Sequence, residues 1–161
     1  MKYFTLQACI HSETAVVRGI DNTPTPDVEA HIVESVETLL DPLCEAWEAR
    51  CNKKGWKNTH IRIVSGYRSA ALIRAEGDSS TSAHGYGYAF DLVPANGQMQ
   101  EFKHFCRDFV SGRAFDQLIS EGENESGIPR WMHVGYKHPD GHQQRRQLLS
   151  TVHNKYYPMT E

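Results

Sequence analysis

The sequence predicts an α+β fold in which an antiparallel sheet is covered by helices mainly on one face. One observation is a long series of apolar residues at helical spacing in the first third of the chain. A second observation is the presence of several short apolar runs of strand length. A third is that strands and helices do not alternate regularly, as they would in a protein with a parallel sheet. At 161 residues the chain is long enough for one domain, residues 1–161, with an ordinary core.

Composition excludes several classes of partner. The net charge is −3 and no cluster of lysines and arginines occurs, so we expect no nucleic-acid partner. No apolar run approaches the ~20 residues that span a bilayer. The N-terminal residues lack the apolar core and cleavage site of a signal peptide. We therefore expect a monomer that is synthesised in the cytoplasm.

The four cysteines are predicted to be free. None of them forms a Cys-x-x-Cys pair. Cys44 and Cys51 lie on one predicted helix about two turns, or ~10 Å, apart, which is too far for a disulfide. A cytosolic origin favours reduced thiols, and we expect them to be buried.

The first half of the chain is predicted to be mostly helical. Short helical turns fill residues 3–20, with Thr5 and Ser12 as N-caps. A turn-rich linker then leads to the longest helix, which Thr25 caps and Pro26 opens. Its apolar stripe continues past Pro42, so this proline is expected to kink the helix without ending it. Gly55 provides the stop signal.

The second half mixes strands and helices. Hydrophobic periodicity and turn residues predict strands over 61–64, 88–93, 115–119 and 131–136, and helices over 69–75, 97–111 and 143–150. The strand over 131–136 is expected to be the last of the sheet, and residues 121–129 a hydrophilic loop.

The segment from Ser82 to Asp91 carries the strongest chemical signal. It has the pattern Ser-x-His-x-x-Gly-x-Ala-x-Asp. Imidazole and carboxylate both suit a first-row metal such as Zn²⁺. His84 lies in a glycine-rich loop, and Asp91 shares one face of its strand with the small residue Ala89, because side chains alternate along a strand. As an alternative, His84 is a surface residue and Asp91 a turn former.

His133 is the predicted third ligand. It lies in a short apolar strand, which would hold its ring rigidly. Three protein ligands with one open position for water are typical of catalytic zinc. The sequence therefore predicts one Zn²⁺ per chain, held by His84, Asp91 and His133.

These residues also carry a family resemblance. Ser82–Asp91, with Ser65–Ser69 before it and Trp131–Gly135 after it, resembles the zinc D-Ala-D-Ala peptidases. This superfamily includes peptidoglycan carboxypeptidases, phage endolysins and the hedgehog signalling domain. The resemblance covers residues 1–136 and leaves residues 137–161 as a C-terminal extension.

The resemblance implies a function. It implies a zinc site in a cleft on an antiparallel sheet and the hydrolysis of a peptide bond in peptidoglycan stem peptides, with carboxypeptidase and endopeptidase action both open. A chain without a signal peptide resembles phage or prophage lysis enzymes, which act on the cell wall once released.

Hydrolysis also requires a general base. The family usually places an acid three residues before the last histidine, but Arg130 stands there. Glu121 is the better candidate, because the run from Phe115 resembles the hedgehog segment and alternation places Glu121 on one face with Ile119. Glu123 and Glu125 are rivals that we expect to be solvated in the following loop.

Three further residues are expected at the site. The planar charged group of Arg68 suits a substrate carboxylate or a developing oxyanion, although a surface arginine in a turn is the alternative. Ser82 is expected either to bind substrate or to brace the His84 loop. Trp131 is expected to wall the cleft or to pack in the core.

The sequence leaves a second class of function open. A zinc-stabilised module that binds cell-wall or protein ligands without catalysis would keep the same metal site, as the hedgehog domain does. The arginine at position 130 is the basis for this alternative.

Overall fold

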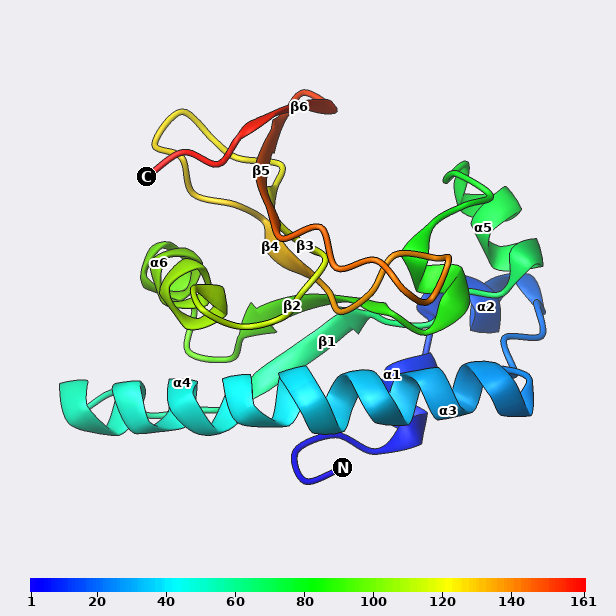
Figure 1. The fold of residues 1–161 in the computed structure, drawn as a ribbon, viewed down its shortest axis with the longest axis horizontal. Coiled ribbons are helices and arrows are strands. Elements are labelled where there is room, and N and C mark those ends of the chain that lie inside the picture. Colours follow the sequence, from blue (N-terminus) through cyan, green and yellow to red (C-terminus); the bar gives the residue numbers. More distant parts are fainter.

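The fold combines helices with one open six-stranded sheet. A computed structural model describes residues 1–161 (Figure 1). The strand order is β1-β2-β4-β3-β5-β6, and every neighbouring pair is antiparallel except β3 and β5, which are parallel. The α+β class and a mostly antiparallel sheet are therefore confirmed.

Two short helices open the chain where the capping residues predict them. Helix α1 spans Leu6–Ile10 and α2 spans Glu13–Arg18. The hydroxyls of Thr5 and Ser12 accept hydrogen bonds of 3.1 Å from backbone N–H groups in the first turns. These bonds satisfy donors that have no partner within the helix.

The longest helical segment passes through Pro42 without a break. It consists of α3 (Pro26–Ser35), the π-helical turn η1 (Val36–Leu40) and α4 (Asp41–Lys54). Proline has no N–H and clashes with the carbonyl one turn earlier. The wider π turn, in which the Asp41 N–H bonds the Val36 carbonyl, accommodates it. The helix then ends at Gly55, whose φ is +73°.

The middle of the chain builds the part of the sheet that carries the predicted metal ligands. Its elements agree with the sequence prediction to within about two residues. They are β1 (Ile61–Ser65), α5 (Ala70–Glu76), the 3₁₀ helix η2 (Ala83–Tyr86), β2 (Ala89–Pro94), α6 (Met99–Val110), β3 (Gln117–Glu121) and β4 (Trp131–Gly135).

The predicted C-terminal helix over 143–150 is wrong. This segment contains β5 (Gln147–Val152), which pairs with β3, and a final strand β6 (Lys155–Pro158) follows, so β4 does not end the sheet. The unpaired edge of β3 offers a row of hydrogen-bonding groups that outweighs local helix propensity. His153 and Asn154, both with positive φ, form the two-residue turn that reverses the chain into β6.

The core joins one face of the sheet to the helices. Alternate residues of the central strands, including Phe90, Met132 and Leu118, belong to a cluster of 25 buried residues that also contains Trp47 and Phe102. In Figure 1 the α3–α4 segment runs along the lower side of the molecule beneath β1 and β2. The other residues of each strand point to the opposite face, where the predicted site lies.

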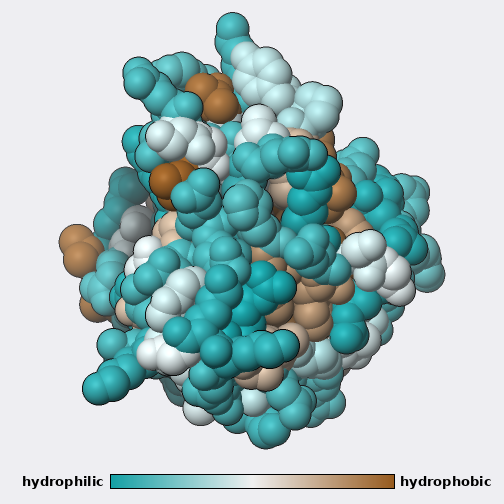
Figure 2. All heavy atoms as spheres, turned by 90° about the vertical axis from the view of Figure 1, so that its left-hand side faces the viewer, coloured by the Kyte–Doolittle hydropathy of each residue, from teal (hydrophilic) through white to brown (hydrophobic).

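The four cysteines are buried and unpaired, as predicted. At the surface, the side of the molecule seen in Figure 2 is mainly hydrophilic, with hydrophobic side chains showing only in limited patches. None of the helices has both the length and the apolar character required to cross a membrane.

Candidate metal centre

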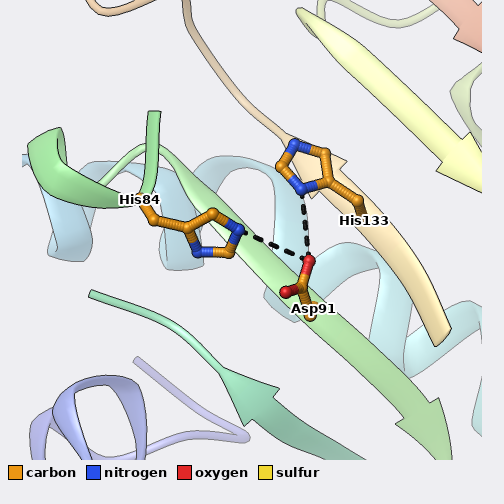
Figure 3. A group of neighbouring side chains, drawn as sticks. All are labelled: His84, Asp91 and His133. Carbon is orange, nitrogen blue, oxygen red and sulfur yellow. Dashed lines mark hydrogen bonds and ion pairs between the residues drawn. The ribbon is translucent and has the colours of Figure 1, made fainter. Parts of the chain in front are cut away.

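Three buried side chains converge on one point of the sheet. His84 comes from η2, Asp91 from β2 and His133 from β4, and their nearest ligand atoms all lie within 4.8 Å of one another (Figure 3). Asp91 and His133 are direct partners across the antiparallel strands. Asp91 Oδ1 lies 3.4 Å from His84 Nε2 and 3.1 Å from His133 Nδ1.

The backbone fixes the orientation of His84. Its Nδ1 donates a hydrogen bond of 2.8 Å to the Gly66 carbonyl, which can only accept. The Ser82 hydroxyl accepts a 3.3 Å hydrogen bond from the His84 backbone N–H and so braces the loop. With the proton on Nδ1, the Nε2 lone pair faces the carboxylate of Asp91. Such a second hydrogen bond is typical of metal-binding histidines.

The electrostatics of the group suit a cation. Burial opposes ionisation of Asp91, but the charges and hydrogen bonds of His84 and His133 outweigh burial and lower its pKa. His84 Nε2 lies 3.4 Å from an ionised carboxylate oxygen, whose negative charge would stabilise a cation bound at this point. Two imidazoles and one carboxylate fit Zn²⁺ as a donor set.

The predicted site residues line one open pocket of about 440 Å³. The structure therefore brings together residues from four separate parts of the sequence. They are Arg68, Ser82, His84, Asp91, Glu121, Trp131 and His133. Trp131 is half-buried and lies at the edge of this pocket as part of its wall.

Glu121 lies at the end of β3 on the same face as the candidate metal ligands. It pairs with Trp131 across the strands, and its carboxylate accepts a 2.8 Å hydrogen bond from the Thr151 hydroxyl. The same hydroxyl oxygen accepts a 2.8 Å bond from the Gly122 N–H, which leaves its proton for Glu121. Burial raises the pKa of Glu121, while the bond from Thr151 lowers it to a smaller extent.

The expectation that Glu123 is solvated is wrong. Glu123 is buried, and its carboxylate forms a 2.7 Å ion pair with the equally buried Lys103 of α6. The physical reason is Gly122, whose φ of +62° ends the strand and turns the next residues away from the site. Glu125 is exposed in the loop, as predicted.

Arg68 lies beside the candidate metal ligands in a network of hydrogen-bond acceptors. Its guanidinium donates to Ser65 Oγ at 2.9 Å, to Asp78 Oδ2 at 2.8 Å and to Asp91 Oδ2 at 3.1 Å. Its Nε also lies 3.6 Å from Glu76 Oε2. The arginine therefore orients Asp91 and balances its charge, and it still lines the pocket.

Three further residues, which the sequence did not indicate, shape the site. Asp78 follows α5, Thr151 lies on β5, and Tyr156 lies on β6 and lines the pocket wall. The last two belong to the segment that was predicted to be an extension. The β-branched residues Thr151 and Val152, followed by a polar pair at 153 and 154, are a weak local signal for strand β5.

Comparison with known families gives one match. Residues 2–125 match the family described as Peptidase M15. This segment includes His84 and Asp91 and ends before His133, which the fold places next to them. A search of curated proteins found no match.

Proposed function

The chain belongs to the peptidase M15 family of zinc D-Ala-D-Ala carboxypeptidases and endopeptidases, and from this membership we propose that it hydrolyses a peptide bond in the stem peptides of peptidoglycan. The convergence of His84, Asp91 and His133 beside a half-buried glutamate carries this proposal. The same pocket is open to solvent on the side where a substrate would enter.

His84, through Nε2, Asp91, through Oδ1, and His133, through Nδ1, would hold one zinc ion. Zinc in such a site supplies Lewis acidity, which polarises a carbonyl group and lowers the pKa of water toward ~7. The Gly66 carbonyl keeps His84 in the tautomer that this requires, and Arg68 keeps Asp91 in place.

Glu121 is the proposed general base. Its carboxylate takes a proton from the attacking water as the oxygen forms a bond to the substrate carbonyl carbon. When the C–N bond breaks, the same proton passes to the leaving amine, so the glutamate returns to its starting state. The raised pKa of Glu121 suits this exchange, because the carboxyl group must both accept and release the proton.

Arg68, Ser82 and Trp131 would shape the substrate site. The positive charge of Arg68 beside the metal ligands would favour the negative charge that develops on the carbonyl oxygen. Ser82 supports the metal site by bracing the His84 loop. Trp131 would present an apolar wall to the peptide at the pocket edge.

A digestion experiment tests the proposal. Purified peptidoglycan is incubated with the zinc-loaded protein, and the soluble products are identified by mass spectrometry. We expect fragments that differ from the substrate by the cleavage of one peptide bond, and none after zinc is removed by a chelator. Intact peptidoglycan in both samples would contradict the proposal.

The alternative of a binding module predicts a different result. The residue at the position where the family usually has an acid is Arg130, which favours this alternative. A binding module would sediment with peptidoglycan and release no fragments. The presence of Glu121 in the pocket, which supplies the acid from another strand, is the reason for preferring the enzyme.

A further inference from the structure

A second hollow adjoins the metal pocket. It has a volume of about 420 Å³ and is bounded by the segments 11–14 and 63–65. The two hollows share Arg68, Asp91 and Trp131 as lining residues, so they meet beside the metal ligands. A peptide laid over this shared boundary would place residues in both hollows at once.

The second hollow contains an arginine without a counter-ion. Arg130 is exposed and forms no ion pair. By contrast, Arg68 is bound to Asp91 and Asp78, and Arg145 in the metal pocket forms a 2.7 Å ion pair with Asp116. The two glutamates of the second hollow have other partners, since Glu13 contacts His11 at 2.8 Å and Glu76 lies 3.6 Å from Arg68. Arg130 is therefore the one arginine of the two hollows that forms no ion pair.

Arg130 is also held close to the proposed base. Its backbone N–H donates a 2.8 Å hydrogen bond to the Glu121 carbonyl. Its aliphatic stem packs over Gly122, where an added Cβ would lie 3.2 Å from the arginine Cδ. The stem of Arg130 therefore lies against the end of β3, and the residue lines the second hollow next to Trp131.

We propose that the second hollow is a second substrate arm in which Arg130 binds a carboxylate group of the peptide, so that the enzyme cleaves an internal peptide bond. This inference rests on the proposed peptidase function. A planar guanidinium with no partner matches a carboxylate in shape and charge. A substrate that fills both arms extends by more than one residue on each side of the cleaved bond, whereas a carboxypeptidase substrate has a single residue on the leaving side.

The test compares two synthetic stem peptides that extend beyond the cleaved bond in both directions. They are identical except that the carboxylate distant from that bond is free in one and is a carboxamide in the other. We expect the zinc-loaded protein to cut an internal bond and Arg130→Gln to raise KM for the acid peptide about tenfold, with kcat little changed. KM for the amide peptide should stay the same, and Arg130→Lys should lie between the two.

Arg74→Gln is the matched control, because Arg74 is an exposed arginine of α5 outside both hollows. It should affect neither peptide. Release of only the terminal residue, or an equal effect of Arg130→Gln on both peptides, would overturn the inference and leave the peptidase function intact.

Peptide binding, measured by calorimetry, separates this inference from the proposed function. If the wild type cuts neither peptide, the proposed function fails. The second arm would then still require that Arg130→Gln weakens binding of the acid peptide about tenfold and leaves binding of the amide peptide unchanged. Equal binding of both peptides by both proteins would remove the arm as well.

Discussion

Two groups of buried charged side chains lie a short distance apart in this protein, and they differ in how their hydrogen bonds are used. One is the ion pair of Lys103 and Glu123, and the other is the group of His84, Asp91 and His133. The proposed base Glu121 is only two residues from Glu123 in the sequence, yet it belongs to the second group.

The ion pair is saturated. Lys103 donates to Glu123, to the Gly127 carbonyl and to the Thr160 hydroxyl, which uses all three of its N–H bonds. Glu123 also accepts from the hydroxyls of Ser150 and Thr160. A cluster whose donors and acceptors are all matched joins α6 to the end of the chain and has no capacity left for a ligand.

The metal group is not saturated and faces a pocket. His133 Nδ1 forms a hydrogen bond of 3.1 Å with Asp91 Oδ1, whereas His84 Nε2 lies 3.4 Å from the same oxygen as an ion-pair contact, so this atom can still bind a cation. Burial of charge alone therefore does not mark a functional site. Convergence of unmatched donor atoms beside an open pocket does, because such an arrangement becomes favourable only when a cation is bound.

Removal of a metal ligand should have the largest effect. We expect His84→Ala and His133→Ala to lose bound zinc, as measured by metal analysis, and to lose peptidase activity down to background. The matched control is His60→Ala, since His60 is an exposed histidine away from the pocket. Full zinc content in both ligand variants would show that the metal binds elsewhere.

Replacement of the base should separate chemistry from metal binding. Glu121→Gln is expected to keep zinc and to lower kcat by about 10²–10⁴-fold, which is the usual contribution of general acid–base catalysis. Glu125→Gln, in the exposed loop, should behave as the wild type. Equal activity of wild type and Glu121→Gln would mean that another group accepts the proton.

Substitution in the Lys103–Glu123 ion pair should lower the stability of the fold and leave the metal site unchanged. Lys103→Met leaves Glu123 buried without its partner, and we expect urea unfolding to show a loss of about 3–5 kcal/mol. Lys54→Met removes an exposed ion pair with Glu101 and should cost less than about 1 kcal/mol. Zinc content per folded molecule should be unchanged in both.

The pH dependence of stability should follow the same pair. Burial opposes ionisation of Glu123, but its hydrogen bonds to Lys103 and the nearby hydroxyls outweigh burial and lower its pKa in the folded protein. The stabilisation is therefore present above the pKa of an unfolded glutamate, about 4.3, and is lost as pH falls from there through the lowered folded value. Unfolding of the double variant Lys103→Met, Glu123→Met should lack this acid-dependent loss.

The same contrast explains what the sequence could predict. His84 and Asp91 were predictable because a glycine-rich loop followed by a strand fixes their relative position locally. The different positions of Glu121 and Glu123 could not be predicted in this way. Strand alternation alone would place both side chains on one face, but the turn at Gly122 directs Glu123 away from the site. Strand β5 pairs with the edge of β3, which lies far away in the sequence and is therefore not part of any local pattern.

The smallest effect should come from Thr151, which joins the last strands to the site. Thr151 and Ser150 are consecutive residues of β5, so they point to opposite faces of the sheet, and they bond Glu121 and Glu123 respectively. Thr151→Val removes the hydroxyl at nearly constant volume. The Glu121 carboxylate then loses a hydrogen bond that fixes its position, and we expect kcat to fall about tenfold with KM and zinc content unchanged.

Thr151→Ser distinguishes positioning from packing. Serine keeps the hydroxyl that accepts from the Gly122 N–H and donates to Glu121, but it lacks the methyl group. If Thr151 acts by orienting the base, the serine variant should retain kcat within about twofold, although it loses some stability through the missing methyl. If the serine variant loses as much activity as Thr151→Val, the methyl group and the packing of β5 matter more than the hydrogen bond. The C-terminal strands would then support the sheet without setting the geometry of the base.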